Sequence, residues 1–238
     1  MLTRHKNIFF QTLSKLYPDD RTDLIRSTPW QLLVAVVMSA QTTDKQVNKM
    51  TEKFFDKIKT PYDTLQLTEE QRYEYIKWVN YAPTKARNIY KTAQILVNIA
   101  SSWVEHSGIE GSSQWKVFSD IIVPWNSYTI PNSLSELIKL HGVGEKTAKV
   151  ILHVLYRTDD IAVDTHVHRV CNRIWLVNTK EPLQTSKLLD KVIPKAYKSI
   201  AHHSLVFFWR YQCTARKPKC QECPFTKFCH YYNNGNKK

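Results

Sequence analysis

The chain has 238 residues, enough for one large domain or two small ones with a buried core. It carries 34 Lys and Arg against 21 Asp and Glu, a formal net charge of +13, and 42% of its residues are hydrophobic. This composition excludes a disordered polyelectrolyte, and no run approaches the ~18–20 apolar residues of a membrane span. No early apolar stretch is long enough for a signal peptide. The excess of positive charge favours a polyanionic partner, nucleic acid first and an acidic membrane surface second.

The hydrophobic pattern reads as one helix after another. Only five residues are glycine, and apolar residues recur at helical spacing. Thr28, Pro29 and Gln31 predict a helix start in which Thr28 caps the helix and Gln31 closes a capping box. Residues 101–130 mix Ser, Gly and aromatic residues, which predicts an insertion with a small cluster of its own. That cluster would contain three of the seven tryptophans, Trp103, Trp115 and Trp125.

Four of the five cysteines fall within 17 residues, with the spacing C-x6-C-x2-C-x5-C. They are Cys213, Cys220, Cys223 and Cys229. Nothing suggests secretion, so disulfides are not favoured, whereas four thiolates in a short loop can converge on one metal centre. Zinc and a [4Fe–4S] cluster both accept four cysteines. Cys171 lies instead on the apolar stripe of a predicted helix, and we interpret it as a core residue.

The six residues between the first two of these cysteines form a basic loop. Its cationic residues are Arg216, Lys217 and Lys219. A loop fixed at both ends that presents three cations is suited to contact phosphates. The alternative is a solvated basic loop without a ligand.

A second candidate site is a glycine turn between two apolar helical patterns. Gly142 and Gly144 flank Val143, and backbone N–H groups at such a turn and helix start can bind phosphate oxygens. Lys146 falls in the first helical turn, where the helix dipole disfavours a cation, so it is a candidate phosphate contact or amine nucleophile. Asp164 precedes another helical pattern and is predicted to cap it, a role compatible with catalysis. Spacing alone does not bring Lys146 and Asp164 together.

These segments together resemble the endonuclease III family of helix-hairpin-helix DNA glycosylases. Four segments in family order carry the resemblance: S-A-Q-T-T-D at residues 39–44, L-H-G-V-G-E-K-T-A at 140–148, I-A-V-D-T-H-V-H-R-V-C-N-R at 161–173, and the cysteine array. The resemblance covers most of residues 1–100 and nearly all of 131–232. It implies a [4Fe–4S] cluster rather than zinc.

The family implies an all-α fold of two helical domains with DNA in the cleft between them. We expect one domain over residues 22–158, with the helix-hairpin-helix and the insertion of about 101–130. The other domain would be discontinuous, residues 1–21 plus 159–238, and would carry the C-terminal cluster loop.

The resemblance also implies an activity, that of a bifunctional DNA N-glycosylase and abasic-site lyase in base excision repair. Such an enzyme removes oxidised pyrimidines and cleaves 3′ to the abasic site by Schiff-base β-elimination. Lys146 would be the nucleophile, Asp164 would stabilise the positive charge on the sugar, and Gln41 would fill the gap left by the flipped nucleotide. The expected partner is double-stranded DNA with damaged bases or abasic sites, bound by a monomer without a membrane. The expected location is the cytoplasm, with the nucleoid, if the source is prokaryotic, or else the nucleus or an organelle.

Two alternatives remain open on the residues alone. A monofunctional mismatch glycosylase would lack the lysine found at position 146, and a non-catalytic DNA-binding module would use the hairpin and the cluster for recognition only. The chain also departs from the family where a G-L-Y type wedge is usual, because residues 80–83 read N-Y-A-P. Tyr81 can still stack on bases as an aromatic wedge.

Overall fold

The computed structural model describes residues 2–18, 23–106, 115–118, 121–124 and 128–234, and within residues 100–127 it describes the backbone alone. The chain divides into two compact units. We call Asp23–Ile151 the central unit, and Met1–Thr22 with Leu152–Lys238 the terminal unit. Within the described residues, no helix combines the length and apolar character needed to cross a bilayer.

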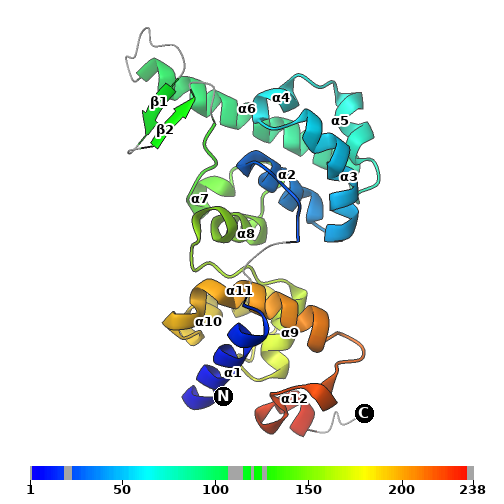
Figure 1. Ribbon diagram of the computed structural model, residues 1–238, viewed down its shortest axis with the longest axis vertical. Helices are drawn as coiled ribbons and strands as arrows, with labels where there is room; N and C mark the ends of the chain where they lie inside the picture. The colour runs from blue at the N-terminus through cyan, green and yellow to red at the C-terminus, as the bar shows by residue number, and fades with distance from the viewer. Residues whose placement is uncertain (1, 19–22, 107–114, 119–120, 125–127, 235–238) are drawn as a thin grey trace. The chain divides into compact units, whose positions relative to one another are not determined.

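The central unit is built around one almost entirely buried helix, α2. Its elements are α2 (Pro29–Ser39), α3 (Asp44–Lys57), α4 (Pro61–Leu65), α5 (Glu69–Ile76), α6 (Ala82–His106), β1 (Trp115–Phe118), β2 (Ile121–Pro124), α7 (Leu134–Leu137) and the start of α8 (Glu145–Tyr156). Every side chain of α2 from Trp30 to Met38 is buried. The long α6 contacts α2, α4 and α5, and α3 contacts α2 and α5 (Figure 1). A helix that is apolar all round thus forms the centre of this unit.

The start of α2 agrees with the sequence except at one side chain. Thr28 Oγ1 accepts from the N–H of Gln31 at 3.1 Å, and Pro29 occupies the first turn, so the predicted cap is confirmed. The capping box is not formed, because the Gln31 carboxamide is 1% exposed and reaches elsewhere. Its Oε1 accepts from Ser27 N at 2.8 Å, and its Nε2 donates to the Phe55 carbonyl at 2.8 Å. Gln31 therefore joins α2 to α3.

The predicted helical class is confirmed, and one pair of strands is added to it. β1 and β2 are antiparallel, with Trp115 opposite Pro124 and Phe118 opposite Ile121. The sequence analysis predicted no strand here, because both runs are continuously rich in β-branched and aromatic residues and lack an alternating pattern. The tryptophan cluster expected in residues 101–130 lies outside the described side chains.

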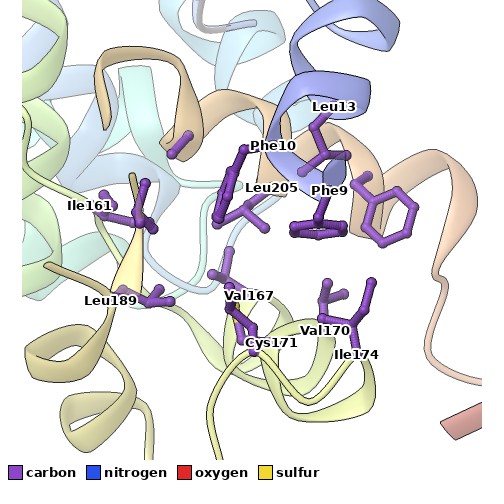
Figure 2. Close-up of a cluster of buried hydrophobic side chains, with 14 of the residues drawn as sticks. Phe9, Phe10, Leu13, Ile161, Val167, Val170, Cys171, Ile174, Leu189 and Leu205 are labelled. Carbon is purple, nitrogen blue, oxygen red and sulfur yellow. The ribbon is translucent and has the colours of Figure 1, made fainter. Parts of the chain in front are cut away.

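The terminal unit joins the first helix of the chain to its C-terminal third. Its elements are α1 (Thr3–Leu16), the end of α8, α9 (Thr165–Arg173), α10 (Pro182–Val192), η1 (Lys195–Tyr197), α11 (Lys198–Phe207), η2 (Phe208–Gln212), η3 (Cys220–Glu222), η4 (Thr226–Phe228) and α12 (His230–Asn233). The blue α1 lies against the orange α11 in Figure 1. Figure 2 shows Phe9 and Leu13 of α1 in one core with Val170 and Cys171 of α9. Cys171 is 0% exposed, which confirms it as a core residue.

Candidate functional site

The turn between α7 and α8 is a tight hairpin in which the two glycines differ in their surroundings. Gly142 has a φ of +79°, in the left-handed region that favours glycine. A Cβ there would lie 3.0 Å from Asn88 Nδ2 and 3.3 Å from Val37 Cγ1. At Gly144 a Cβ would meet no atom of the described residues within 4 Å. Gly142 therefore seats the turn against α6 and α2, whereas Gly144 leaves its surface open to a close ligand.

The start of α8 presents backbone amides beside this open surface. The Gly144 carbonyl accepts from Ala148 N at 2.9 Å, the first bond of the helix. By helix geometry, the N–H groups of the first turn have no acceptor within the helix and suit an anion. Val143 differs, because its side chain is buried and its N–H donates to the Leu140 carbonyl at 3.2 Å. Both of these Val143 groups are thus engaged within the protein.

Lys146 is the second residue of α8, and its side chain is exposed. On the same helix start, Lys149 is buried, and its Nζ lies 3.1 Å from Glu145 Oε1. The amine of Lys146 therefore accompanies the amides of the first turn. This combination suits a primary amine that must reach the sugar of a nucleotide whose phosphate the amides bind.

Asp164 caps α9, as its position in the sequence predicts. Its Oδ1 accepts from the N–H groups of His166 at 2.9 Å and Val167 at 2.8 Å. The residue has extended backbone angles, with φ −101° and ψ −178°, just before the helix begins. Two hydrogen bonds to one oxygen fix the direction in which the carboxylate points.

Lys146 belongs to the central unit and Asp164 to the terminal unit. α8 passes from one to the other, since its residues from Leu152 onward belong to the terminal unit. There His153 anchors the end of the helix, with Nδ1 3.0 Å from the Thr158 carbonyl and Nε2 3.1 Å from His203 Nδ1. One helix and the loop of residues 157–164 thus connect the two candidate catalytic groups along the chain. The sequence analysis did not single out His153.

Gln41 and Tyr81, the two candidate base contacts, lie at turns that are joined by hydrogen bonds. Both have left-handed backbones, with φ of 59° and 60°, and both side chains are exposed. Asn80 Nδ2 donates to the Gln41 carbonyl, and Asn80 N donates to Thr42 Oγ1 at 3.2 Å. Left-handed residues other than glycine are costly and persist only where their surroundings hold them. The structure therefore brings these two sequence-predicted residues into one rigid pair of turns.

Lys85 holds the base of this pair and was missed by sequence reasoning. Its side chain is 6% exposed, and Nζ donates to the carbonyls of Met38 at 2.8 Å and Ala40 at 2.6 Å, at the end of α2. Burial lowers the pKa of this amine. The available signal was its place at helical spacing with the buried Ala86 and Ile89. A lysine on an apolar face is rarely buried without partners.

The four cysteines of the predicted metal site line one pocket in the terminal unit. The empty volume is about 360 Å³, open solvent included, and Arg173 of α9 and Phe225 complete part of the wall. No three His, Cys, Asp or Glu side chains of the described residues are grouped so as to hold a single metal ion. A single zinc would need its thiolates at about 2.3 Å from one point. A pocket between the thiols instead fits a cluster of several atoms.

The ionisation of these thiols also fits a cationic metal group. Burial, and then the nearby Cys229, Cys213 and Cys220, raise the pKa of Cys223 to about 11. Burial and the neighbouring cysteines likewise raise the pKa of Cys229. Four thiolates are therefore unfavourable here unless a cation compensates their charge, which iron does in a cluster.

The basic loop is closed at its ends by hydrogen bonds. Lys219 N donates to the Gln212 carbonyl at 3.0 Å, and Gln212 Nε2 donates back to the Lys219 carbonyl at 2.5 Å. Within the loop, Thr214 Oγ1 donates to the Lys217 carbonyl at 2.7 Å. Arg216, Lys217 and Lys219 are all exposed. The loop thus holds three cations toward solvent on a constrained backbone.

Two further residues fix this region, and the sequence analysis assigned neither of them a role. Arg173 donates to the carbonyls of Thr214 at 2.7 Å and Ala215 at 2.8 Å, which ties α9 to the basic loop. Phe225, between the last two cysteines, is 0% exposed, and its ring centroid lies 4.7 Å from that of Phe9 in a T-shaped contact. Both contacts join segments distant in sequence, so no local pattern reveals them.

Comparison with known proteins agrees with these features. Residues 34–195 match the family model of the HhH-GPD superfamily of base excision DNA repair proteins, and residues 213–229 match the iron-sulfur binding domain of endonuclease III. The chain is 37% identical over 228 residues to endonuclease III of Rickettsia felis, covering 96% of this chain and 95% of that one. It is 37% identical over 214 residues to endonuclease III of Escherichia coli, covering 90% and 89%.

Solved structures show the same likeness. A trapped covalent intermediate of endonuclease III with DNA superposes with a TM-score of 0.81 at 34% identity, covering 98% of both chains. A non-covalent complex of endonuclease III with DNA gives 0.82 at 33% identity, covering 100% of both. A thermostable thymine-DNA glycosylase, at 22% identity and a TM-score of 0.75, shares the fold.

Proposed function

Since the chain belongs to the endonuclease III family and is thus a base excision repair DNA glycosylase with abasic-site lyase activity, we propose that Lys146 and Asp164 carry out its chemistry. The observation that supports this most directly is the exposed amine of Lys146 in the first turn of α8, beside the open surface at Gly144. A relative of this chain was captured as a covalent intermediate with DNA, which agrees with a nucleophilic amine.

Lys146 is the proposed nucleophile for both bond cleavages. Its amine bonds to C1′ of the damaged nucleotide while the bond from C1′ to the base breaks, and the base leaves with the electron pair and takes up a proton. The amine loses a proton, the sugar ring opens, and a Schiff base remains. Removal of a proton from C2′ then expels the 3′ phosphate, which cuts the strand. Water releases the enzyme.

Asp164 is the proposed carboxylate partner of this reaction. A carboxylate near C1′ stabilises the positive charge that develops on the sugar and accepts a proton from the attacking amine. Its two bonds from the start of α9 hold it in one orientation, so no reorganisation is needed as the charge develops.

The DNA contacts that we propose come from both units. In the central unit they are Gln41, Tyr81 and the hairpin residues Gly142, Val143 and Gly144, of which Val143 contributes the shape of the turn. In the terminal unit they are the three cations of the basic loop. The hairpin and the loop bind phosphates, whereas Gln41 and Tyr81 meet bases exposed when the damaged nucleotide leaves the stack.

A [4Fe–4S] cluster is the cofactor of this protein, and Cys213, Cys220, Cys223 and Cys229 are its proposed ligands. When bound, the cluster supplies the positive charge that four buried thiolates need. The residues of this chain then hold the basic loop between two of the ligands. The cluster site lies outside the steps assigned to Lys146 and Asp164.

The proposed lesions are oxidised pyrimidines, and borohydride trapping on a duplex with thymine glycol tests the whole proposal. The wild-type protein should form a covalent adduct that Lys146→Ala loses. Lys139→Ala, which removes another exposed lysine of the α7–α8 turn, should keep the adduct. Base release without strand cutting would instead indicate a monofunctional glycosylase, and binding with neither activity would indicate a recognition module. Size-exclusion chromatography tests the proposed monomer, and co-purification with chromosomal DNA tests association with the nucleoid.

The two roles of Asp164 can be separated by a pair of substitutions. Asparagine is as good an N-cap as aspartate, whereas alanine costs about 1 kcal/mol of stability. Asp164→Asn should therefore unfold at the wild-type urea concentration while losing at least 100-fold in glycosylase rate. Asp164→Ala should lose both. An Asp164→Asn protein with wild-type turnover would remove Asp164 from the chemistry.

A further inference from the structure

Trp78 is an exposed aromatic residue that the proposed reaction does not use. It lies in the connection between α5 and α6, the same connection that carries Tyr81. Its side chain is 68% exposed and that of Tyr81 is 66% exposed, the two highest values among aromatic side chains of the described residues. Tryptophan is highly buried on average, so such exposure points to a contact made with a ligand.

The backbone under Trp78 is held on both sides. Gln46 Nε2 of α3 donates to the Trp78 carbonyl at 3.4 Å, and Val79, which follows it, is 4% exposed. Asn80 then bonds to the Gln41 turn. The indole therefore projects from a constrained connection rather than from a free loop, which lowers the ordering cost of a contact.

The surroundings of the indole suit DNA rather than an acidic partner. The chain has a net charge of +13, and Lys77 Nζ lies 5.8 Å from the centre of the Trp78 ring. Lys77 also pairs with Glu74 at 2.6 Å, so the local charge is modest and the aromatic face dominates. An aromatic face beside a base-contacting turn stacks on nucleobases of any identity.

We propose that Trp78 is a second stacking residue, which binds an unpaired nucleobase of the distorted duplex alongside Tyr81. This inference rests on the proposed function, because only a duplex with a flipped or missing base exposes such a base. Two rings on one constrained connection would give the enzyme affinity for the lesion site that depends little on which base is opposite.

Equilibrium binding tests this proposal with the holoprotein and a duplex that contains a tetrahydrofuran abasic analogue, which cannot form a Schiff base. Loss of one base stack corresponds to about 5- to 150-fold weaker binding. Trp78→Ala should therefore lose affinity in that range for the abasic duplex and little for the undamaged duplex. Trp78→Phe should keep most of the affinity. Tyr73→Ala, which removes a 39% exposed ring from α5, should bind as the wild type does.

The salt dependence separates stacking from a phosphate contact. Removing a stacked ring leaves the slope of log affinity against log salt unchanged, whereas losing a phosphate contact lowers it by about 0.9. Wild-type affinity of Trp78→Ala for the abasic duplex, an equal loss on undamaged DNA, or an altered slope would each overturn the proposal. Failure of the proposed function has a different sign, because the wild-type protein itself would then form no borohydride adduct.

Discussion

Phe225 anchors the cluster loop, and its truncation is the sharpest test of how that loop is held. The side chain is 0% exposed and makes T-shaped contacts with Phe9, at 4.7 Å between ring centroids, and Phe208, at 5.3 Å. Replacing a fully buried phenylalanine with alanine costs about 3–5 kcal/mol. For a protein of this size, that corresponds to a fall of about 10 °C in Tm. Because Cys223 and Cys229 lie on either side of Phe225, the loss should also release the cluster.

The control is Phe228→Ala in the same loop. Phe228 is only half-buried and stacks on His5 with ring centroids 4.9 Å apart, so its loss should cost about 1 kcal/mol. Thermal and urea unfolding give the stability, and the visible thiolate-to-iron absorption per mole of protein gives cluster content. Equal stability and equal cluster content in the two variants would refute the anchoring role of Phe225.

Three further predictions follow from the hairpin and the cluster region. Gly142→Ala should destabilise the protein by about 1–2 kcal/mol, because alanine there needs a left-handed backbone and meets Asn88, whereas Gly144→Ala should keep wild-type Tm and weaken DNA binding; equal Tm values would contradict this. Alanine at each cation of the basic loop should lower the salt slope of DNA binding by about 0.9, with little change in lesion preference, as binding titrations at several salt concentrations would detect. Removal of iron should weaken binding through the basic loop while near-ultraviolet circular dichroism of the central unit stays largely native, and unchanged affinity after iron loss would disprove that link.

The sequence by itself determined the features that depend on short spacing along the chain. The cysteine array, the glycine turn before Lys146, and the caps Thr28 and Asp164 each lie within a few turns of backbone, so their geometry follows from local covalent constraints. Cys171 was also predictable, because helical periodicity decides which face of a helix is buried. These features were enough for the family, the cofactor and the candidate catalytic residues.

Only the tertiary structure decided the contacts between distant segments. Lys85 meets the end of α2, Asn80 meets the Gln41 turn, and Phe225 meets Phe9 across most of the chain length. It also redirected Gln31 from a capping box to the carbonyls of α3, and showed the strand pair in a segment without alternation. Such contacts depend on which surfaces meet after the helices pack, and the pattern within any one helix leaves that choice open.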